Sequence, residues 1–573
     1  MIPASWKDEL KRSIRPVPEG RVCRMVGLHL EVEGVDAALG EAIRVEIEGA
    51  DKILAEVVAI SDGRLVCMPY GELAGVRFGA RAIPLNRAPA VAVGRSILGR
   101  IVDANGHPID GMGPIVAEDM VGVLNAAPAP LVRPLITEQL PLGIRVLDTM
   151  VACGKGQRLG IFAGAGVGKS SLVSMAIRGT KAPVKVLALI GERGREVREF
   201  IERDLGEEGL ASAAVVVATS DQPALVRIRA ALTATRIAEW FRDQGEDVLL
   251  IMDSLTRLAM AQREVGISTG EPPTMRGYPP SVGSLMARLL ERAGSSDQGS
   301  ITALYTVLVD GDDMLDPVAD AARSILDGHI TLSRTRAQMS HYPAVDVLDS
   351  VSRLESSILS DRQRLLVQSA RRLLAVYQGS VDLIEVGAYR PGVNQQLDLA
   401  IAVRERLEAV FGQDVHELSP VETSWSLLAE AMPRGKLVIA LRLAEMERRV
   451  KQIAAAEAAA RLRLAEEAQT LATGNALELS RELVSLPGTP ELATLGRLSC
   501  TAADQDRRVT QERTAELLAA LADLHEKQVW TNAVTRLIEK RHRQERYREE
   551  RRSTTELVES ALRRIPRRDD VHS

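Results

Sequence analysis

The chain has 573 residues, of which 72 are basic and 77 acidic, and 46% are apolar but only 3% aromatic. This length predicts about three or four domains with aliphatic cores. No run of 18 apolar residues occurs and charges interrupt the first twenty residues, so we expect neither a membrane span nor a signal peptide. The cysteines show no CxxC spacing and are expected to be buried, reduced thiols of a cytoplasmic protein: Cys23, Cys67, Cys153 and Cys500.

Residues 1–20 form the first predicted unit. Trp6, Leu10 and Ile14 are four residues apart, which would give a helix one apolar face among charged residues. We predict a docking helix here, and the alternative is a frayed terminus.

Residues 21–90 are rich in Val, Leu and Gly. Short alternating runs at 43–47 and 53–60 are separated by turns that contain glycine. That pattern predicts a small antiparallel β-barrel. Prolines and glycines from 84 to 141 then indicate a linker-like region.

Residues 91–352 form the predicted central domain, where buried-strand runs alternate with helical stretches. This rhythm predicts a parallel sheet covered by helices, and therefore an α/β fold. Residues 353–432 are predicted to be mostly helical. The strand runs lie at 159–162, 184–190, 213–217, 248–252 and 300–308.

Residues 433–573 differ from the rest, because Pro433 and Gly435 mark a boundary beyond which the chain is basic and rich in Ala, Leu, Arg and Glu. Apolar residues recur at helical steps from Leu443 to Leu471, and prolines and glycines then precede a second helical stretch at 504–563. Two long helices around one break predict an antiparallel coiled-coil hairpin, and the alternative is a solvated, partly disordered tail.

The segment AGAGVGKS at 163–170 fits the phosphate-binding loop, with Ala at the first Gly position. It follows a predicted strand and precedes a predicted helix, as that motif requires. Glycines would let backbone N–H groups surround phosphate oxygens, Lys169 would contact the β- and γ-phosphates, and Ser170 would supply a hydroxyl to Mg²⁺. The predicted nucleotide contacts are Gly164, Ala165, Gly166, Val167, Gly168, Lys169, Ser170 and Ser171.

Two acidic residues follow predicted strands of the same sheet. Asp253 ends the apolar run at 247–253 and would orient Mg²⁺, usually through water. Glu192 follows the run at 184–190 and could polarise the water that attacks the γ-phosphate. From the residues alone, a surface salt bridge is an equal alternative for Glu192.

Ordered motifs over about residues 20–432 resemble those of flagellar and type III secretion export ATPases, within the superfamily of rotary-ATPase catalytic subunits. The segment at 271–282 is specific to the export branch, and 300–313 favours the flagellar one. The resemblance implies a RecA-like central domain that hydrolyses ATP. The matching segments are VG and DANG within 93–106, GIRVLD at 143–148, GERGRE at 191–196, EPP with RGYPPSV at 271–282, and PAVD with SVSR at 343–353.

The resemblance also implies roles for single residues. Glu192 matches the general base, and Arg193 matches a residue near the γ-phosphate. Arg353 matches an arginine finger that reaches into the neighbouring subunit's site, with an ordinary ion pair as the alternative. Tyr342 matches an aromatic residue that packs on adenine. The expected catalytic set is therefore Lys169, Glu192, Arg193 and Arg353, with ATP and Mg²⁺ bound.

A finger that acts in trans implies a ring, which the family builds as a homohexamer. The implied partners are a stator-like regulatory protein on residues 1–20, export-gate membrane proteins, and exported substrates with their chaperones. The resemblance places the protein in the cytoplasm, at the periphery of the inner-membrane export apparatus. No nucleic-acid partner is expected.

Two features depart from the family pattern. The tail resembles the family's coiled-coil stalk protein, the flagellar export chaperone or stalk, which is normally a separate chain. Export ATPases also usually have Phe where Gly283 stands and Pro where Ala287 stands. This segment is expected to face the ring's pore, so the residues at those two positions would affect how the ring contacts a central stalk.

Two other functions fit parts of the sequence. A non-catalytic nucleotide-binding subunit of the same superfamily would have Gln where Glu192 stands. A hexameric RNA translocase would need an aromatic-rich RNA-binding domain, whereas the predicted barrel carries only Tyr70 and Phe78 as aromatic residues. We therefore expect an export-type ATPase.

Overall fold

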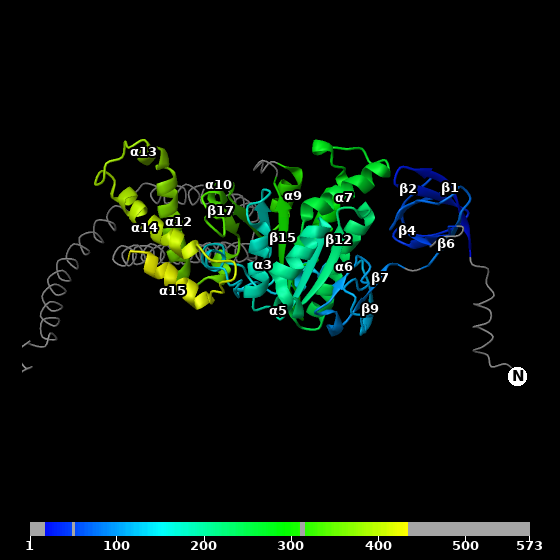
Figure 1. The fold of residues 1–573 in the computed structure, drawn as a ribbon, viewed down its shortest axis with the longest axis horizontal. Helices are drawn as coiled ribbons and strands as arrows, with labels where there is room; N and C mark the ends of the chain where they lie inside the picture. Colours follow the sequence, from blue (N-terminus) through cyan, green and yellow to red (C-terminus); the bar gives the residue numbers. More distant parts are fainter. Residues whose placement is uncertain (1–17, 48–51, 87, 310–315, 434–573) are drawn as a thin grey trace, which may run out of the picture. The chain divides into compact units, whose positions relative to one another are not determined.

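The computed structural model describes residues 18–47, 52–86, 88–309 and 316–433 (Figure 1). The docking helix predicted at residues 1–20 falls almost wholly outside the described residues. The coiled-coil hairpin predicted at 433–573 also lies outside them, as does Cys500. Of the three described cysteines, Cys67 and Cys153 are buried as expected, but Cys23 is only partly buried.

An N-terminal barrel closes from six antiparallel strands in the order β1-β2-β5-β4-β3-β6. Alternate residues point inward, so Val22, Leu30 and Val57 are fully buried in its core. The predicted barrel is confirmed. Its strands are β1 (Gly20–Val26), β2 (His29–Glu33), β3 (Ala42–Val45), β4 (Ile53–Ser61), β5 (Arg64–Pro69) and β6 (Arg81–Pro84).

The central domain is built on a nine-stranded sheet with the order β17-β16-β10-β15-β13-β11-β12-β8, and β14 pairs with β15 beside this path. Neighbours from β16 to β8 run parallel, whereas β17 is an antiparallel edge strand. The five predicted strand runs are confirmed. The strands are β8 (Ile101–Val102), β10 (Arg158–Ala163), β11 (Val184–Glu192), β12 (Ala213–Thr219), β13 (Asp247–Asp253), β14 (Gly294–Ser295), β15 (Ser300–Leu308), β16 (Gly328–Leu332) and β17 (Val345–Ser352).

The region at 84–141 is not only a linker, which corrects the prediction from its prolines and glycines. It contains the two-stranded ribbon β7 (Ala90–Val93) with β9 (Asp119–Gly122), and β8 joins the edge of the main sheet. The strand β8 is too short for sequence periodicity to show it. Short 3-10 turns lie at Arg95–Ile97 and Pro130–Val132.

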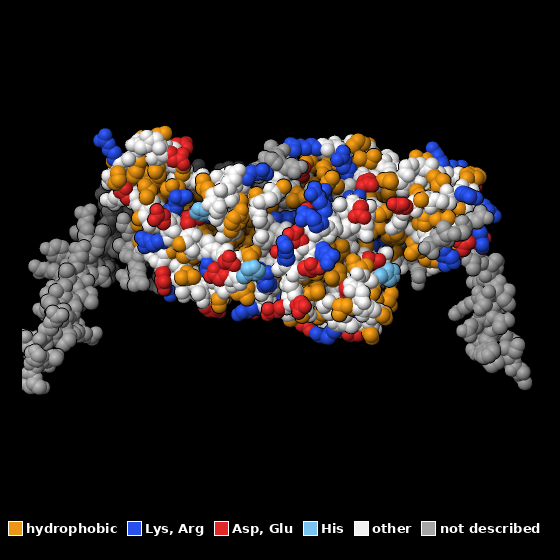
Figure 2. Space-filling model, in the orientation of Figure 1, with side chains coloured by type: hydrophobic (Ala, Val, Ile, Leu, Met, Phe, Trp, Pro, Cys, Tyr) orange, Lys and Arg blue, Asp and Glu red, His pale blue; other side chains and the backbone are white. Residues whose placement is uncertain are grey.

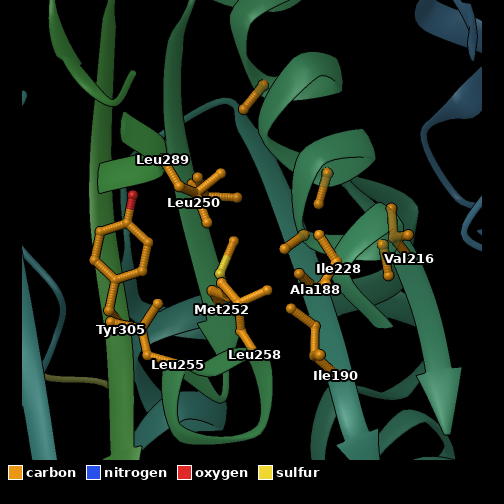
Figure 3. Packing of buried hydrophobic residues seen from close by; sticks show 14 of the residues in the cluster. Ala188, Ile190, Val216, Ile228, Leu250, Met252, Leu255, Leu258, Leu289 and Tyr305 are labelled. Carbon is orange, nitrogen blue, oxygen red and sulfur yellow. The ribbon is translucent and has the colours of Figure 1, made fainter. Parts of the chain in front are cut away.

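Helices cover both faces of the sheet. One core lies under the helices α6 to α9, where Ile228 and Leu258 meet Ala188, Met252 and Tyr305 of the strands (Figure 3). The other core lies under α3 and the C-terminal helices. The central helices are α2 (Arg145–Met150), α3 (Lys169–Gly179), α4 (Gly194–Glu199), the π-helix η3 (Phe200–Leu205), α5 (Gly206–Ala211), α6 (Ala224–Asp243), α7 (Leu255–Ser268), η4 (Met275–Gly277), α8 (Pro280–Leu290), α9 (Pro317–Ile325) and α10 (Arg334–Gln338).

The C-terminal region is helical, as predicted. It is fastened to the central domain by the buried guanidinium of Arg145, whose Nε donates to the carbonyl of Val410 at 2.8 Å and which also pairs with Glu417. The helices are α11 (Glu355–Ile358), α12 (Asp361–Gln378), α13 (Val381–Glu385), α14 (Gln395–Phe411) and α15 (Val421–Ala431).

The surface carries both signs of charge. Figure 2 shows basic and acidic side chains interspersed over one face of the described residues, with apolar side chains between them. Within the part of the chain that the structure describes, no helix has the length and apolar character needed to cross a membrane.

Candidate nucleotide-binding and hydrolysis site

The phosphate-loop sequence forms the turn between β10 and α3. β10 ends at Ala163, and α3 begins at Lys169 and runs for 11 residues. Gly166 and Gly168 have φ angles of 77° and 92°, a left-handed conformation that favours glycine. The loop therefore presents backbone N–H groups at the amino end of a helix, an arrangement that binds phosphate.

Three charged side chains meet beside this loop. Lys169 Nζ lies 2.5 Å from Asp253 Oδ1 and 3.5 Å from Glu192 Oε1. All three side chains are at most 15% exposed. The hydroxyl of buried Thr306 donates to Asp253 Oδ1 at 2.7 Å and holds that carboxylate in place. Ser170 and Ser171 are exposed at the start of α3.

The sheet brings these residues together. β10, β13 and β11 run parallel, so the residues at their carboxyl ends lie along one edge. A register shift between Ile190 and Glu192 places Glu192 at the end of β11. This edge is where ligands bind in open α/β sheets.

The two sides of the cluster have shifted pKa values. Burial alone would lower the pKa of Lys169, but Asp253 and Glu192 outweigh burial and raise it. Burial raises the pKa of Glu192, and Asp253 adds to this, while Lys169 and Arg257 oppose it. Lys169 therefore stays charged, and Glu192 becomes a better proton acceptor than an exposed glutamate.

Arg257 belongs to the site although the sequence analysis did not include it. It lies on α7, four residues after Asp253, and its Cβ would be 2.8 Å from a Cβ added at Gly191. Gly191 also has a φ of 70°, so glycine is favoured there for two reasons. Among the described residues, Arg257 Nε is buried and has no hydrogen-bond partner. A basic residue one helical turn after the strand-ending Asp253 is the signal that could have identified it.

Tyr342 also reaches the loop, from a distant part of the chain. A Cβ added at Gly168 would lie 3.4 Å from Tyr342 Cε1. Tyr342 is 46% exposed, so part of its ring surface is open beside the phosphate loop. The sequence resemblance had placed the two residues in one site, and the structure brings them together.

Two predicted residues do not join this cluster. Arg193 lies next to Glu192, but its side chain is 75% exposed and pairs with Glu196 at 3.5 Å. Arg353 follows β17, which runs antiparallel to β16, so it lies at the opposite edge of the sheet. Its backbone N–H donates to the carbonyl of Asp327, whose own N–H donates to Arg158 at the start of β10.

The separation between Arg353 and Lys169 follows from strand geometry. β10 has six residues, from Arg158 to Ala163, where the phosphate loop begins. At about 3.3 Å per residue, the two edges are roughly 20 Å apart. The side chain of Arg353, whose Nη2 donates to the carbonyl of Arg323 at 3.0 Å, therefore cannot act at the phosphate loop of its own chain.

A parallel sheet with this loop, two strand-ending carboxylates and a buried lysine defines a phosphate-loop nucleotide-binding enzyme. Residues 143–352 match the nucleotide-binding domain of the ATP synthase alpha/beta family, and residues 359–430 match the C-terminal domain of the type III secretion ATPase EscN. The chain belongs to the family of flagellum-specific ATP synthases and type III secretion ATPases, which are ATP-hydrolysing enzymes.

This chain matches its relatives over nearly their whole length. The flagellum-specific ATP synthase of Bacillus subtilis is 47% identical over 411 residues, which cover 71% of this chain and 94% of that relative. The type 3 secretion system ATPase of Xanthomonas euvesicatoria is 48% identical over 410 residues, with 71% and 93% covered. The assembled ATPase EscN of enteropathogenic E. coli is 40% identical with a TM-score of 0.69, and the match covers 72% of this chain and 99% of EscN.

Proposed function

We propose that this chain is the ATP-hydrolysing subunit of a motor that energises flagellar or type III protein export. The observation that supports this most is the meeting of Lys169, Asp253 and Glu192 at one edge of the sheet. A binding-only subunit would not need a water-activating carboxylate beside the phosphate loop. The family names of the relatives support the link to export.

In the proposed reaction, water attacks the γ-phosphorus of ATP and the bond to the β-phosphate oxygen breaks. Residues 164–171 hold the phosphates, and Lys169 neutralises charge on the β- and γ-phosphates. Glu192 orients the water and takes its proton, which its raised pKa favours. Arg193 is adjacent, and its exposed side chain would leave Glu196 to turn towards the γ-phosphate. The ring of Tyr342 would pack on adenine.

The donors near the loop suit Mg²⁺, because a carboxylate and a hydroxyl are hard oxygen ligands. Asp253 and Ser170 would hold the ion with the nucleotide's phosphates. When bound, Mg²⁺ supplies positive charge against the phosphate oxygens.

The opposite-edge position of Arg353 supports a finger that acts in trans. In a ring, this residue would complete the site of the next subunit, as the resemblance implies. EscN has been solved as an assembly, and also with its central stalk EscO. We propose a homohexamer for this chain, with residues 433–573 as its stalk-like part.

The wider setting is also a proposal. A stator-like protein would bind residues 1–20, and export-gate membrane proteins, substrates and chaperones would meet the ring at the cytoplasmic side of the inner membrane. Flagellum-specific ATP synthases match this chain over 71–75% of its length, and this match supports the proposed setting. We propose no nucleic-acid partner.

Glu192→Gln tests the proposed function. The variant should bind a fluorescent ATP analogue with Mg²⁺ as the wild type does, but lose about 100-fold or more of its turnover, because only the water-activating carboxylate changes. Glu202→Gln is the matched control, since it makes the same change at a residue whose side chain is 60% exposed and pairs with Arg198 at 2.8 Å, and it should keep normal turnover. Near-normal turnover in Glu192→Gln would refute the role of Glu192.

A further inference from the structure

A buried amide is one of the groups that tie the loop between α14 and α15 to the central domain. Gln413 is 5% exposed. Its Oε1 accepts from the backbone N–H of Arg145 at 2.8 Å, and its Nε2 donates to the carbonyls of Gly143 and Glu417, both at 2.8 Å. One acceptor and two donors are used, which a primary amide of this length supplies and a carboxylate does not.

The backbone of the same residue holds Tyr342. The N–H of Gln413 donates to the carbonyl of Tyr342 at 3.0 Å. The ring of Tyr342 lies beside Gly168 of the phosphate loop. A shift of Gln413 would therefore move the tyrosine relative to the phosphate loop.

The loop has a second attachment, on the helix that begins with Lys169. Arg178 near the end of α3 donates to the carbonyl of Val415 and also to the carbonyl of Asp204 at the π-helix η3. Residues 412–417 are thus fastened both to the tyrosine and to the phosphate-loop helix. The loop position cannot change without straining one of these contacts.

We propose that Gln413 is a positioning residue that sets the placement of Tyr342 and thereby the affinity of the site for the nucleotide base. This inference rests on the proposed adenine contact of Tyr342. It connects the C-terminal helices to base binding, because α14 and α15 end and begin at this loop (Figure 1). Gln413 does not touch the reacting atoms, so it acts on binding rather than on the chemical step.

Gln413→Glu is the sharpest test, because the side chain keeps its shape while its NH₂ group is replaced by an oxygen. That oxygen cannot donate to the two carbonyls that the NH₂ group contacts. We expect the KM for MgATP to rise about tenfold while kcat stays within about twofold, since the lost binding is shared equally by the ground state and the transition state. Gln396→Glu is the matched control, with the same change on an exposed residue of α14. If the variant does not fold, Gln413→Asn keeps the amide on a shorter stem and should give a smaller rise in KM.

A double-mutant cycle with Tyr342→Ala separates positioning from a general structural effect. In the Tyr342→Ala background, Gln413→Glu should raise KM no further. Additive increases, or a fall in kcat at unchanged KM, would overturn the inference while leaving the proposed function intact. An unchanged KM in Gln413→Asn or in Tyr342→Ala alone would also overturn it. If the wild type binds MgATP without hydrolysing it, the proposed function itself fails.

Discussion

At the residue scale, Arg257 is the clearest addition to the predicted site. The positive charge of Arg257 on α7 lowers the pKa of Glu192, and burial without a partner at Nε is costly unless a ligand supplies one. A phosphate oxygen is the group that the neighbouring phosphate loop would bring. Arg257 is therefore placed to stabilise the negative charge of the transferring phosphoryl group.

Arg257→Ala should lower kcat by about 100-fold, the usual cost of removing one charge-stabilising donor. Steady-state hydrolysis of MgATP measures this. Arg263→Ala is the matched control on the same helix, where the guanidinium lies over the ring of Tyr278 at 5.4 Å instead. Equal losses in the two variants would indicate a folding defect rather than a role for Arg257.

Asp148 predicts a pH dependence of stability. Burial raises its pKa from 3.8 to about 7, against the N–H groups of Leu142 and Gly143, which lower it. Between these pKa values the folded chain keeps a proton that the unfolded chain releases. Stability should therefore fall as pH rises from about 4 to 7 and then level, by at most about 4 kcal/mol.

Melting temperatures of the full chain from pH 5 to 8 check this. Asp148→Asn cannot ionise, so its melting temperature should depend less steeply on pH than that of the wild type, even though one backbone hydrogen bond is lost. Parallel curves for the two proteins would contradict the raised pKa of Asp148.

At the element scale, long buried strands and the phosphate loop could be predicted from the sequence, but other parts could not. The runs that became β11, β13 and β15 are mostly apolar and are buried over nearly their whole length, since parallel strands are covered on both faces. β8 has two residues, too few for any periodicity, and is held by its partner β12. Local patterns cannot show such pairing.

The candidate site divides in the same way. Lys169 and its loop are contiguous, and Asp253 and Glu192 end predictable strands. Arg257 had a local signal, its place one helical turn after Asp253, but Gln413 depends on contacts between distant segments, so no local spacing indicates what it touches. Arg353 was found only through the resemblance, and its position at the opposite edge needed the antiparallel register of β17.

α8 offers a test of helix propensity at a position where the family usually has Phe. Gly283 is exposed in the middle of this helix, and a Cβ added there would meet nothing within 4 Å. Gly283→Ala should stabilise the chain by about 0.5–1 kcal/mol, because glycine has greater freedom to lose on folding. Denaturant midpoints measure the change, and a destabilised variant would show that the exposed face of α8 is covered in the native protein.

At the scale of the whole molecule, the position of Arg353 predicts complementation between subunits. Arg353→Ala and Lys169→Ala should each abolish turnover while the rings still assemble. In mixed rings, some interfaces join an intact Lys169 to an intact Arg353, so partial activity should return. Hydrolysis assays on mixtures whose mixing is shown by native mass spectrometry test this, and no recovery would count against action in trans.

The two edges of the sheet also have a consequence for how the protein is switched on. If Arg353 acts in trans as proposed, every subunit would supply half of two different reaction centres, with Lys169 at one edge of its sheet and Arg353 at the other. A newly made subunit would bind ATP without hydrolysing it. The last subunit to join the ring would complete two active sites at once. Ring assembly would then activate ATP hydrolysis, and hydrolysis would be confined to the place where the ring assembles.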